Sequence, residues 1–493
     1  MPNTQTQPEM KRCLGLRETI TITSGTVIGV GLFTVGANVV GEMGSFVIFA
    51  TLAALLISIY PALLYAEMSA ALPYAGGTYQ YASLGLSRGF GMLAGWNFVI
   101  SMVSVASGEA MAFSFYLRTL LNALGLSLPI SDRWLACLVL IGFLVLSARG
   151  VELTGRLQNG FLFFFWGVAI VWILSVLPSM RIGPSILPNP LSMTAVGFFP
   201  CVAMIWWCFA GFETCCAMGE EIRHPQINLP RALILAPFLV FAVNGLFQWA
   251  LVAIVPADSL AQLATAAAPY AQGMEQAGIV GLPLILLCLG IAFGGDFSTL
   301  NAGVSAPARY LYTMARDKAL PAVFSRLHPR FKTPVAAILV LGVLMLLLVC
   351  TDSIGYIASL SLFATLFYYI IGIVSACGLR KKLPKLKRPY RAPLISIGAP
   401  VSAAIYLFMI TQLDLGAVLA GGAWSLLGLV IFLCCRKRRP NCDDGAEASL
   451  PPLPCAPEPQ EKRRMDREYH IWCIAVVLAV LVVIGLHLLL LLS

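Results

Sequence analysis

Long apolar runs recur along the chain, separated by short polar segments. Each run is long enough to cross ~30 Å of hydrocarbon as a helix. The runs are continuously apolar and do not alternate, so they do not indicate barrel strands. The pattern predicts an all-α integral membrane protein. The predicted spans are residues 18–40, 44–72, 89–122, 134–150, 156–178, 193–219, 230–256, 278–314, 334–351, 354–378, 393–412, 415–435 and, as a thirteenth, 469–492.

The composition, rich in hydrophobic residues and poor in charged ones, also indicates a chain that lies in a lipid bilayer. Of 493 residues, 59% are hydrophobic and only 11% are charged, whereas a soluble domain has about 25% charged residues. The net charge of +9 does not indicate nucleic-acid binding, because Lys and Arg gather in cytoplasmic loops as an orientation signal. With the N-terminus inside, all but three of the 32 lysines and arginines fall in cytoplasmic segments; the exceptions are Arg118, Arg133 and Arg181. We therefore expect a multi-pass cell-membrane protein with a cytoplasmic N-terminus and the C-terminus outside.

The chain divides into four expected parts. A cytoplasmic tail, 1–17, precedes a core of twelve spans, 18–436. A flexible cytoplasmic linker is expected at 437–468, because this segment is polar, charged and Pro-rich. The additional membrane helix, 469–492, follows it.

Two predicted spans contain glycine residues in their interior, where glycine destabilises a helix. The first span has Gly25, Gly29 and Gly31, and the sixth has Gly211 beside Glu213. Each glycine costs roughly 1 kcal/mol against alanine in a helix interior. Weak points at matching places in two halves of five spans indicate an inverted-repeat transporter with broken helices. The repeats would cover about 18–180 and 193–378, with spans eleven and twelve at about 393–435.

Breaks of this kind offer backbone groups to a ligand. Free N–H groups at the start of a half-helix attract a carboxylate, and free carbonyl groups attract an ammonium group or a metal cation. An α-amino acid carries both charges, so two broken helices match its constant part. The alternative is that these glycines only let helices pack closely in the membrane.

Four stretches resemble the amino acid–polyamine–organocation (APC) superfamily, over about residues 14–436. The motifs are Gly25-Thr26-Val27-Ile28-Gly29-Val30-Gly31-Leu32-Phe33; Tyr65-Ala66-Glu67-Met68 with Pro73-Tyr74-Ala75-Gly76-Gly77-Thr78-Tyr79-Gln80-Tyr81; Phe209-Ala210-Gly211-Phe212-Glu213 with Glu220-Glu221 and Pro230-Arg231-Ala232; and Ala308-Arg309-Tyr310-Leu311-Tyr312 with Ala315-Arg316-Asp317. The resemblance implies a LeuT-type fold: five plus five inverted spans with two more attached, working by alternating access.

The resemblance also implies roles for single residues. The substrate-binding set that it implies is Thr26, Val27, Gly29, Val30, Gly31, Trp207, Phe209 and Gly211. Within this set, the backbone at residues 29–31 would bind a carboxylate, carbonyl groups of Thr26, Val27 and Phe209 would bind an amine, and Trp207 and Phe209 would form aromatic gates. Glu213 falls on a carboxylate implicated in gating or proton sensing. Several relatives carry a lysine in the fifth span where this chain has Phe165, so coupling through that lysine is not expected.

Carboxylates inside the predicted spans are costly and are therefore functional candidates. Asp296 is followed by Ser298, Thr299 and Asn301, an oxygen-rich group that would hold Na⁺ or, with Asp296 alone, exchange a proton. Glu109 is a second coupling candidate. The alternative for each is a neutral or paired carboxyl group that ties helices together. We assign no metal and expect no cofactor beyond H⁺ or Na⁺ as coupling ion.

The function expected first is secondary transport of amino acids, most directly neutral L-amino acids, by symport or exchange. A polyamine or cationic amino acid carrier is the alternative, and it needs Glu109 or Asp296 to face the pocket. A non-transporting membrane sensor is a third reading. We find no catalytic or ATP-binding motif, so no enzyme is expected. The expected partners are the small-molecule substrate and membrane lipid, with no nucleic acid, and the pattern does not indicate an oligomeric state.

Overall fold

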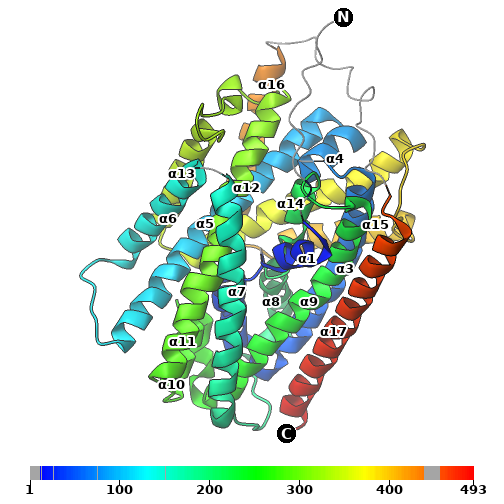
Figure 1. The fold of residues 1–493 in the computed structure, drawn as a ribbon. Coiled ribbons are helices and arrows are strands. Elements are labelled where there is room, and N and C mark those ends of the chain that lie inside the picture. The colour runs from blue at the N-terminus through cyan, green and yellow to red at the C-terminus, as the bar shows by residue number, and fades with distance from the viewer. Residues whose placement is uncertain (1–11, 13, 26, 75, 150, 438–455) are drawn as a thin grey trace, which may run out of the picture.

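The computed structural model describes residues 12, 14–25, 27–74, 76–149, 151–437 and 456–493. The described residues are helical apart from loops and one isolated bridge between Leu14 and Ile222. Figure 1 shows the long helices gathered into one bundle.

The helices range in length from seven residues in α2 to 36 in α5. Their bounds are α1 Leu16–Gly25, α2 Ala37–Met43, α3 Val47–Ala71, α4 Gly77–Gly85, α5 Arg88–Ala123, α6 Asp132–Arg149, α7 Val151–Val176, α8 Ala195–Trp207, α9 Pro225–Ile254, α10 Pro269–Gln276, α11 Leu282–Gly290, α12 Phe297–Arg316, α13 Val335–Val349, α14 Ile354–Lys382, α15 Ile395–Ile410, α16 Leu415–Lys437 and α17 Pro459–Leu492.

Short 3₁₀ and π segments join or extend these helices. They are η1 Gly31–Gly36, η2 Gly44–Phe46, η3 Leu177–Ser179, η4 Pro190–Met193, η5 Phe212–Met218, η6 Ala257–Thr265, η7 Ile291–Asp296 and η8 Ala322–Ser325. Two of them, η1 and η7, are π-helices. Such segments are rare and occur frequently at functional sites.

The last helix gives two reference faces. In Figure 1, α17 runs along the edge of the bundle beside α9, from Pro459 at one face to the C-terminus at the other. We call these the Pro459 face and the Ser493 face. On the opposite side of the bundle, α6 packs against α13 and α5.

The first span is interrupted. Helix α1 ends at Gly25, and helical backbone resumes at Val30 and continues through η1 into α2. The described residues between them form a turn, with the Val27 N–H donating to the Ser24 carbonyl at 3.2 Å. The glycine-rich composition explains the break, because each glycine weakens helix relative to other residues.

The second interruption follows Trp207, where α8 ends. Gly211 has φ +109°, a conformation that glycine adopts readily and L side chains rarely adopt. The chain then continues as the 3₁₀ segment η5. Both interruptions expected from the glycine pattern are therefore present.

The expected all-helical class is confirmed. Among the described residues, nine helices are long and apolar enough to cross a membrane, and α13 and α15 are shorter apolar helices. The 5+5 repeat and the count of thirteen spans stay predictions.

One boundary differs from the expectation. The flexible linker was expected to reach residue 468, but α17 already begins at Pro459. Residues 459–468 were interpreted as linker because they are polar and charged. In the structure they form the polar first turns of the same helix whose later turns are apolar. Proline is tolerated in the first turn, because the N–H that it lacks would have no partner there. The remainder of the expected linker, 438–455, lies outside the described residues.

Candidate functional site

A small pocket lies between the two helix breaks, midway along α5. Its volume is about 40 Å³, far below the 300–1,000 Å³ of ordinary ligand pockets. The lining residues are Val27, Val30 and Gly31 from the first break; Trp207, Ala210, Gly211 and Thr214 from the second; Ser101, Met102, Val105 and Glu109 from α5; Thr299, Ala302 and Gly303 from α12; and Thr365 and Tyr368 from α14. We call it the central pocket.

The backbone freed at the first break is bonded by side chains of other helices. The Val30 N–H donates to Glu109 Oε1 at 2.9 Å. Gly29 stands so close to this carboxylate that a Cβ there would lie 2.2 Å from Glu109 Oε1 and 2.7 Å from Thr299 Oγ1. A side chain at position 29 would force the side chains of Glu109 and Thr299 to move. The amide expected to bind a substrate carboxylate therefore already holds a carboxylate of the protein.

Carbonyl groups of the same break are bonded from α12 and α8. Thr299 Oγ1 donates to the Ile28 carbonyl at 2.9 Å, and Ser298 Oγ donates to the Gly25 carbonyl at 3.4 Å. The Cys208 thiol, at the second break, donates to the Gly31 carbonyl at 3.0 Å. This thiol links the two breaks directly.

Asp296 lies beside the central pocket without lining it. It is fully buried, and its two carboxylate oxygens have no hydrogen-bond partner among the residues that the structure describes. The ionisable group that interacts with Asp296 is Glu109, whose carboxyl group is buried next to it. Buried polar groups are normally bonded. The two carboxyl groups interact with each other, so the pair can share a proton or bind a cation.

Glu213 is held by two tyrosines at the second break. Its carboxylate is buried and accepts hydrogen bonds from the hydroxyl groups of Tyr368 and Tyr369 on α14. Tyr368 also lines the central pocket. Because both partners come from α14, Glu213 fixes the second break against that helix.

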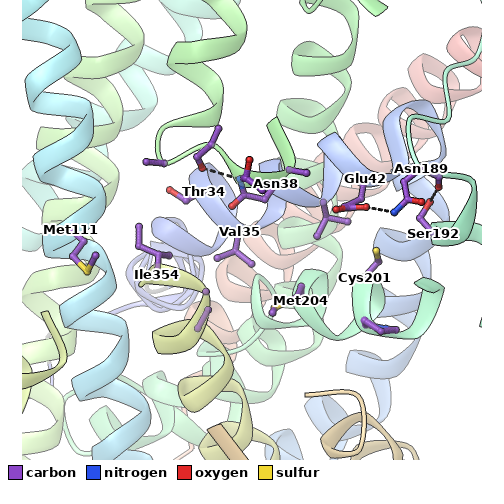
Figure 2. Close-up of a pocket in the computed structure, with 18 of the residues that line it drawn as sticks. Thr34, Val35, Asn38, Glu42, Met111, Asn189, Ser192, Cys201, Met204 and Ile354 are labelled. Atoms are coloured by element: carbon purple, nitrogen blue, oxygen red, sulfur yellow. Dashed lines mark hydrogen bonds between the residues drawn. The ribbon is translucent and has the colours of Figure 1, made fainter. Parts of the chain in front are cut away.

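Trp207 lines the central pocket at the end of α8. Its indole N–H donates to Ser361 Oγ at 3.0 Å, and the side chain is buried. Beyond it lies a larger cavity of about 600 Å³. Figure 2 shows this cavity, with Met204 on one side and Met111 on α5 on another. No lining residue is shared between the two spaces. Helix α8 connects them, because Cys201 and Met204 line the large cavity and Trp207, at the end of the helix, lines the central pocket.

The large cavity has a polar end. Figure 2 shows the Glu42 carboxylate and Asn189 pointing toward one another, with Nδ2 of Asn189 donating to Glu42 Oε2 at 2.5 Å. Asn38 donates to the carbonyl groups of Leu263 and Ala266 at 2.6 and 2.9 Å. These bonds shape the wall of the cavity and tie the loops around its opening to α2.

The structure gathers part of the predicted site. Central-pocket residues that were predicted are Val27, Val30, Gly31, Trp207, Gly211, Glu109 and Thr299. Gly29 contacts the pocket carboxylate, whereas Phe209, Glu213, Asp296, Ser298 and Asn301 are buried around the pocket and do not line it. Thr26 lies outside the described residues.

Sequence reasoning missed the walls formed by α5, α12 and α14. The residues missed are Ser101, Met102, Val105, Ala302, Gly303, Thr365 and Tyr368. The signal was weak: small and hydroxyl-bearing residues cluster there, but such residues also serve helix packing. Cys208 was missed too, because its role depends on contact with a segment 177 residues away.

Two further residues of the predicted spans, Phe165 and Glu67, have defined packing partners. Phe165, found in place of a lysine, packs its ring 5.5 Å from that of Phe33 in η1. Glu67, also inside a span, pairs with Arg380 on α14, its Oε2 lying 2.5 Å from the guanidinium. Arg388 approaches the same carboxylate at 3.4 Å. Glu67 therefore ties helices together at the Pro459 face.

Comparison with known proteins agrees with this architecture. Residues 14–433 match the model of the amino acid permease family. An uncharacterized transporter of Mycobacterium tuberculosis is 28% identical over 445 residues, which cover 90% of this chain and 97% of the relative. The branched-chain amino acid permease BcaP of Lactococcus lactis is 28% identical over 86% of this chain and 95% of its own length. The mouse cationic amino acid transporter 4 is 28% identical over 69% of this chain and 55% of that protein.

A membrane bundle with two broken helices around a small pocket is the architecture of a solute carrier. The chain belongs to the amino acid permease family. The family resemblance stated from the sequence motifs is thereby confirmed, and α17 lies beyond the matched residues.

Proposed function

We propose that this permease is a secondary transporter that moves amino acids across the cell membrane by alternating access, with two inverted five-span repeats, two further spans and a thirteenth. The observation that carries the proposal is the central pocket, which both helix breaks border and which shares no lining residue with the larger cavity. A carrier needs a site of this kind, shielded from both faces at one stage of its cycle.

The Pro459 face is taken as cytoplasmic. Its loops carry the basic residues after α14, among them Arg380 and Arg388, whereas Arg118 and Arg133 lie toward the Ser493 face. An excess of basic residues on one side favours the cytoplasm for that side. The large cavity then opens to the outside, and the structure corresponds to a state closed toward the cytoplasm.

Neutral L-amino acids are the substrates that the pocket supports best. Part of its wall is apolar, formed by Met102, Val105 and Ala302. Among the described residues that line the pocket, Glu109 is the one with an acidic side chain. The pocket of about 40 Å³ must expand to admit a substrate. Binding a substrate carboxylate at the first break also requires Glu109 to release the Val30 amide.

A cationic amino acid or polyamine is the second candidate. It is favoured by one observation: the Glu109 carboxyl group lines the central pocket beside the carboxyl group of Asp296. A second ammonium group would bind there at little cost, since a buried carboxylate gains from a paired charge. A non-transporting sensor has no comparable observation in its favour.

The coupling ion is proposed to bind beside the first break. Asp296, the Thr299 hydroxyl group and the Ile28 carbonyl group offer oxygen ligands, the donor type that Na⁺ shares with other hard cations. The Asp296–Glu109 pair would alternatively exchange a proton. Both versions place coupling directly next to the substrate.

Uptake by purified protein in liposomes tests the function. Radiolabelled leucine, lysine and putrescine would be offered in separate assays, with and without a pH or sodium gradient, and with preloaded unlabelled solute for exchange. We expect saturable leucine uptake that unlabelled branched-chain amino acids compete away. Saturable uptake of lysine or putrescine alone would favour the second candidate, and no uptake or exchange of any amino acid by folded protein would contradict the proposal.

A further inference from the structure

The last helix is docked along its whole length. At the Ser493 face, Ser185 Oγ donates to the carbonyl groups of Leu490 and Leu491 at 2.9 and 3.0 Å, and Ser493 Oγ donates to the Gly183 carbonyl at 2.7 Å. These bonds tie the end of α17 to the segment between α7 and α8. A hydrophobic helix serving only as an anchor would not need them.

The packing between α17 and α9 is close. A Cβ on Gly245 would lie 2.4 Å from Cγ1 of Val483, so the glycine allows the two helices to approach. His487, which is buried, places Nε2 2.9 Å from the Gly245 carbonyl oxygen. Small residues at such a crossing are the usual means of packing helices in lipid. The contact fixes the register of α17 against α9.

The polar beginning of α17 is attached to the start of α9. Asp466 forms an ion pair with Arg231, whose guanidinium carbon lies 4.9 Å from the centre of the Tyr469 ring. Nε2 of His224 lies 3.1 Å from Glu461 Oε1. These groups are partly exposed, so each pair adds little stability. Their effect is to hold the first turns of α17 over the residues that precede and begin α9.

Helix α1 depends on α17 for part of its packing. Leu16 and Ile20 of α1 do not join the main hydrophobic core; they form a separate cluster with Ala232 and Leu235 of α9 and Val476 of α17. Tyr469 and Trp472 of α17 pack against the same cluster. The half-helix on the Pro459 side of the first break is thus packed partly by the added helix.

The segment that follows the second break belongs to the same assembly. Arg12, just before α1, donates to the carbonyl groups of Gly219 and Ile222, both at 3.0 Å. The Arg223 N–H donates to the Leu14 carbonyl at 2.7 Å. His224, which contacts α17, is the next residue. The Pro459-side portions of both broken spans are therefore linked to each other and to the beginning of α17.

We propose that α17 is a built-in accessory helix that restrains α1 and the 219–224 segment, and so holds the Pro459 face of the carrier closed. The inference rests on the alternating-access function proposed above, in which this face must open. Helix α1 has ten residues and is separated from the rest of its span by the break, so it is the piece that can swing about that point. By packing on it, α17 raises the free energy of the open state relative to the closed one.

The test is amide hydrogen exchange of the full-length protein in lipid nanodiscs. One variant combines Glu461→Gln with Asp466→Asn, which removes the charged contacts of α17. A second, Gly245→Val, pushes α17 away through Val483. The matched control is Leu478→Ala on the lipid side of the same helix, where the side chain is 57% exposed.

We expect the amides of residues 17–24 and 219–224 to exchange at least threefold faster in both variants, with α5 and α14 unchanged and the control like the parent. Unchanged exchange in α1 in both folded variants would overturn the proposal, and so would equally faster exchange throughout the bundle. The readout does not require transport. A protein that carries no amino acid but shows this exchange pattern would contradict the proposed function and leave the restraint in place.

Discussion

The two broken helices satisfy their free backbone groups in different ways. At the first break, one turn bonds Val27 to Ser24, and the other partners come from distant segments: Glu109 bonds the Val30 amide, Thr299 the Ile28 carbonyl and Cys208 the Gly31 carbonyl. At the second break, the chain bonds to itself through short turns, with the amides of Cys208, Phe209 and Ala210 donating to the carbonyl groups three residues earlier.

This difference separates the roles of the two sites. A break bonded by side chains of α5 and α12 can exchange those partners for a substrate or an ion without unfolding. A break closed by its own turns and held by Glu213 to two tyrosines keeps its shape. We infer that the first break binds and releases ligands, and that the second supplies a fixed wall and carries Trp207.

The largest effect is expected at Gly29. Gly29→Ala places a methyl group 2.2 Å from Glu109 Oε1, which displaces the Glu109 and Thr299 side chains from their bonds to Val30 and Ile28. We expect transport to fall at least about fiftyfold, or more than about 2 kcal/mol of transition-state stabilisation. Gly31→Ala is the matched control in the same break, since its Cβ would be 3.5 Å from the nearest atom. Uptake in liposomes measures both; similar losses in the two variants would show that the contact with Glu109 is not the cause.

A smaller effect is expected at the second break. Gly211→Ala imposes an L side chain at φ +109°, which costs about 1–2 kcal/mol, and transport should fall about tenfold with insertion unchanged. Gly278→Ala carries a similar strain at φ +72°, in a place with no atom within 4 Å of the new Cβ. If both variants lose transport equally, backbone strain rather than the position of the second break explains the result.

Asp296→Asn tests the ligand exchange assigned to the first break. It replaces a titratable carboxyl group by an amide in the buried Asp296–Glu109 pair. We expect the dependence of uptake on the pH or sodium gradient to change by about fivefold or more, equivalent to about 1 kcal/mol of coupling. Uptake measured with and without each gradient is the readout, and unchanged dependence on both gradients would assign Asp296 to helix packing alone.

Removing the bonds to Glu213 tests the fixed wall. Tyr369→Phe takes one hydroxyl group from a buried carboxylate, and a hydrogen bond to a charged group contributes about 1.5–3 kcal/mol. We expect a lower thermal midpoint in detergent and a modest loss of transport. Tyr270→Phe on α10 is the control, because its hydroxyl group has no partner among the described residues; a larger shift for the control would contradict the role of Glu213.

The smallest effect is expected at the contact between the breaks. Cys208→Ala removes the thiol bonded to the Gly31 carbonyl, a bond contributing about 0.5–1.5 kcal/mol, so transport should fall a few-fold. Cys208→Ser keeps a donor and should retain most of the rate. Equal activity of the alanine and serine variants would show that this bond does not couple the two breaks.

The apolar runs and the glycines were sufficient to predict the membrane class and both interruptions. Length and hydropathy determine whether a segment can cross lipid, and glycine lowers helix stability wherever it stands, so these are local properties. Trp207, Gly211 and Val30 could be placed at the site for the same reason, since they lie in or next to the breaks.

Other parts of the site depended on contacts between distant segments. That Glu109 occupies the Val30 amide, that Asp296 stands behind the pocket, and that Cys208 bonds Gly31 follow from how α5, α12 and α8 pack around the first break. The side on which a helical residue lies is not visible in a span that is apolar all round, because its periodicity is weak.

The sequence by itself determined that the chain lies in lipid, that it is helical and that two of its helices are interrupted, because these properties follow from local composition and backbone preference. Only the tertiary structure decided which side chains form hydrogen bonds to the backbone at the two breaks. It also decided that α17 packs on α1 as well as on α9. The physical reason is that hydrogen-bond partners and packing neighbours are chosen among groups far apart in the chain, and that choice exists only after the helices have assembled.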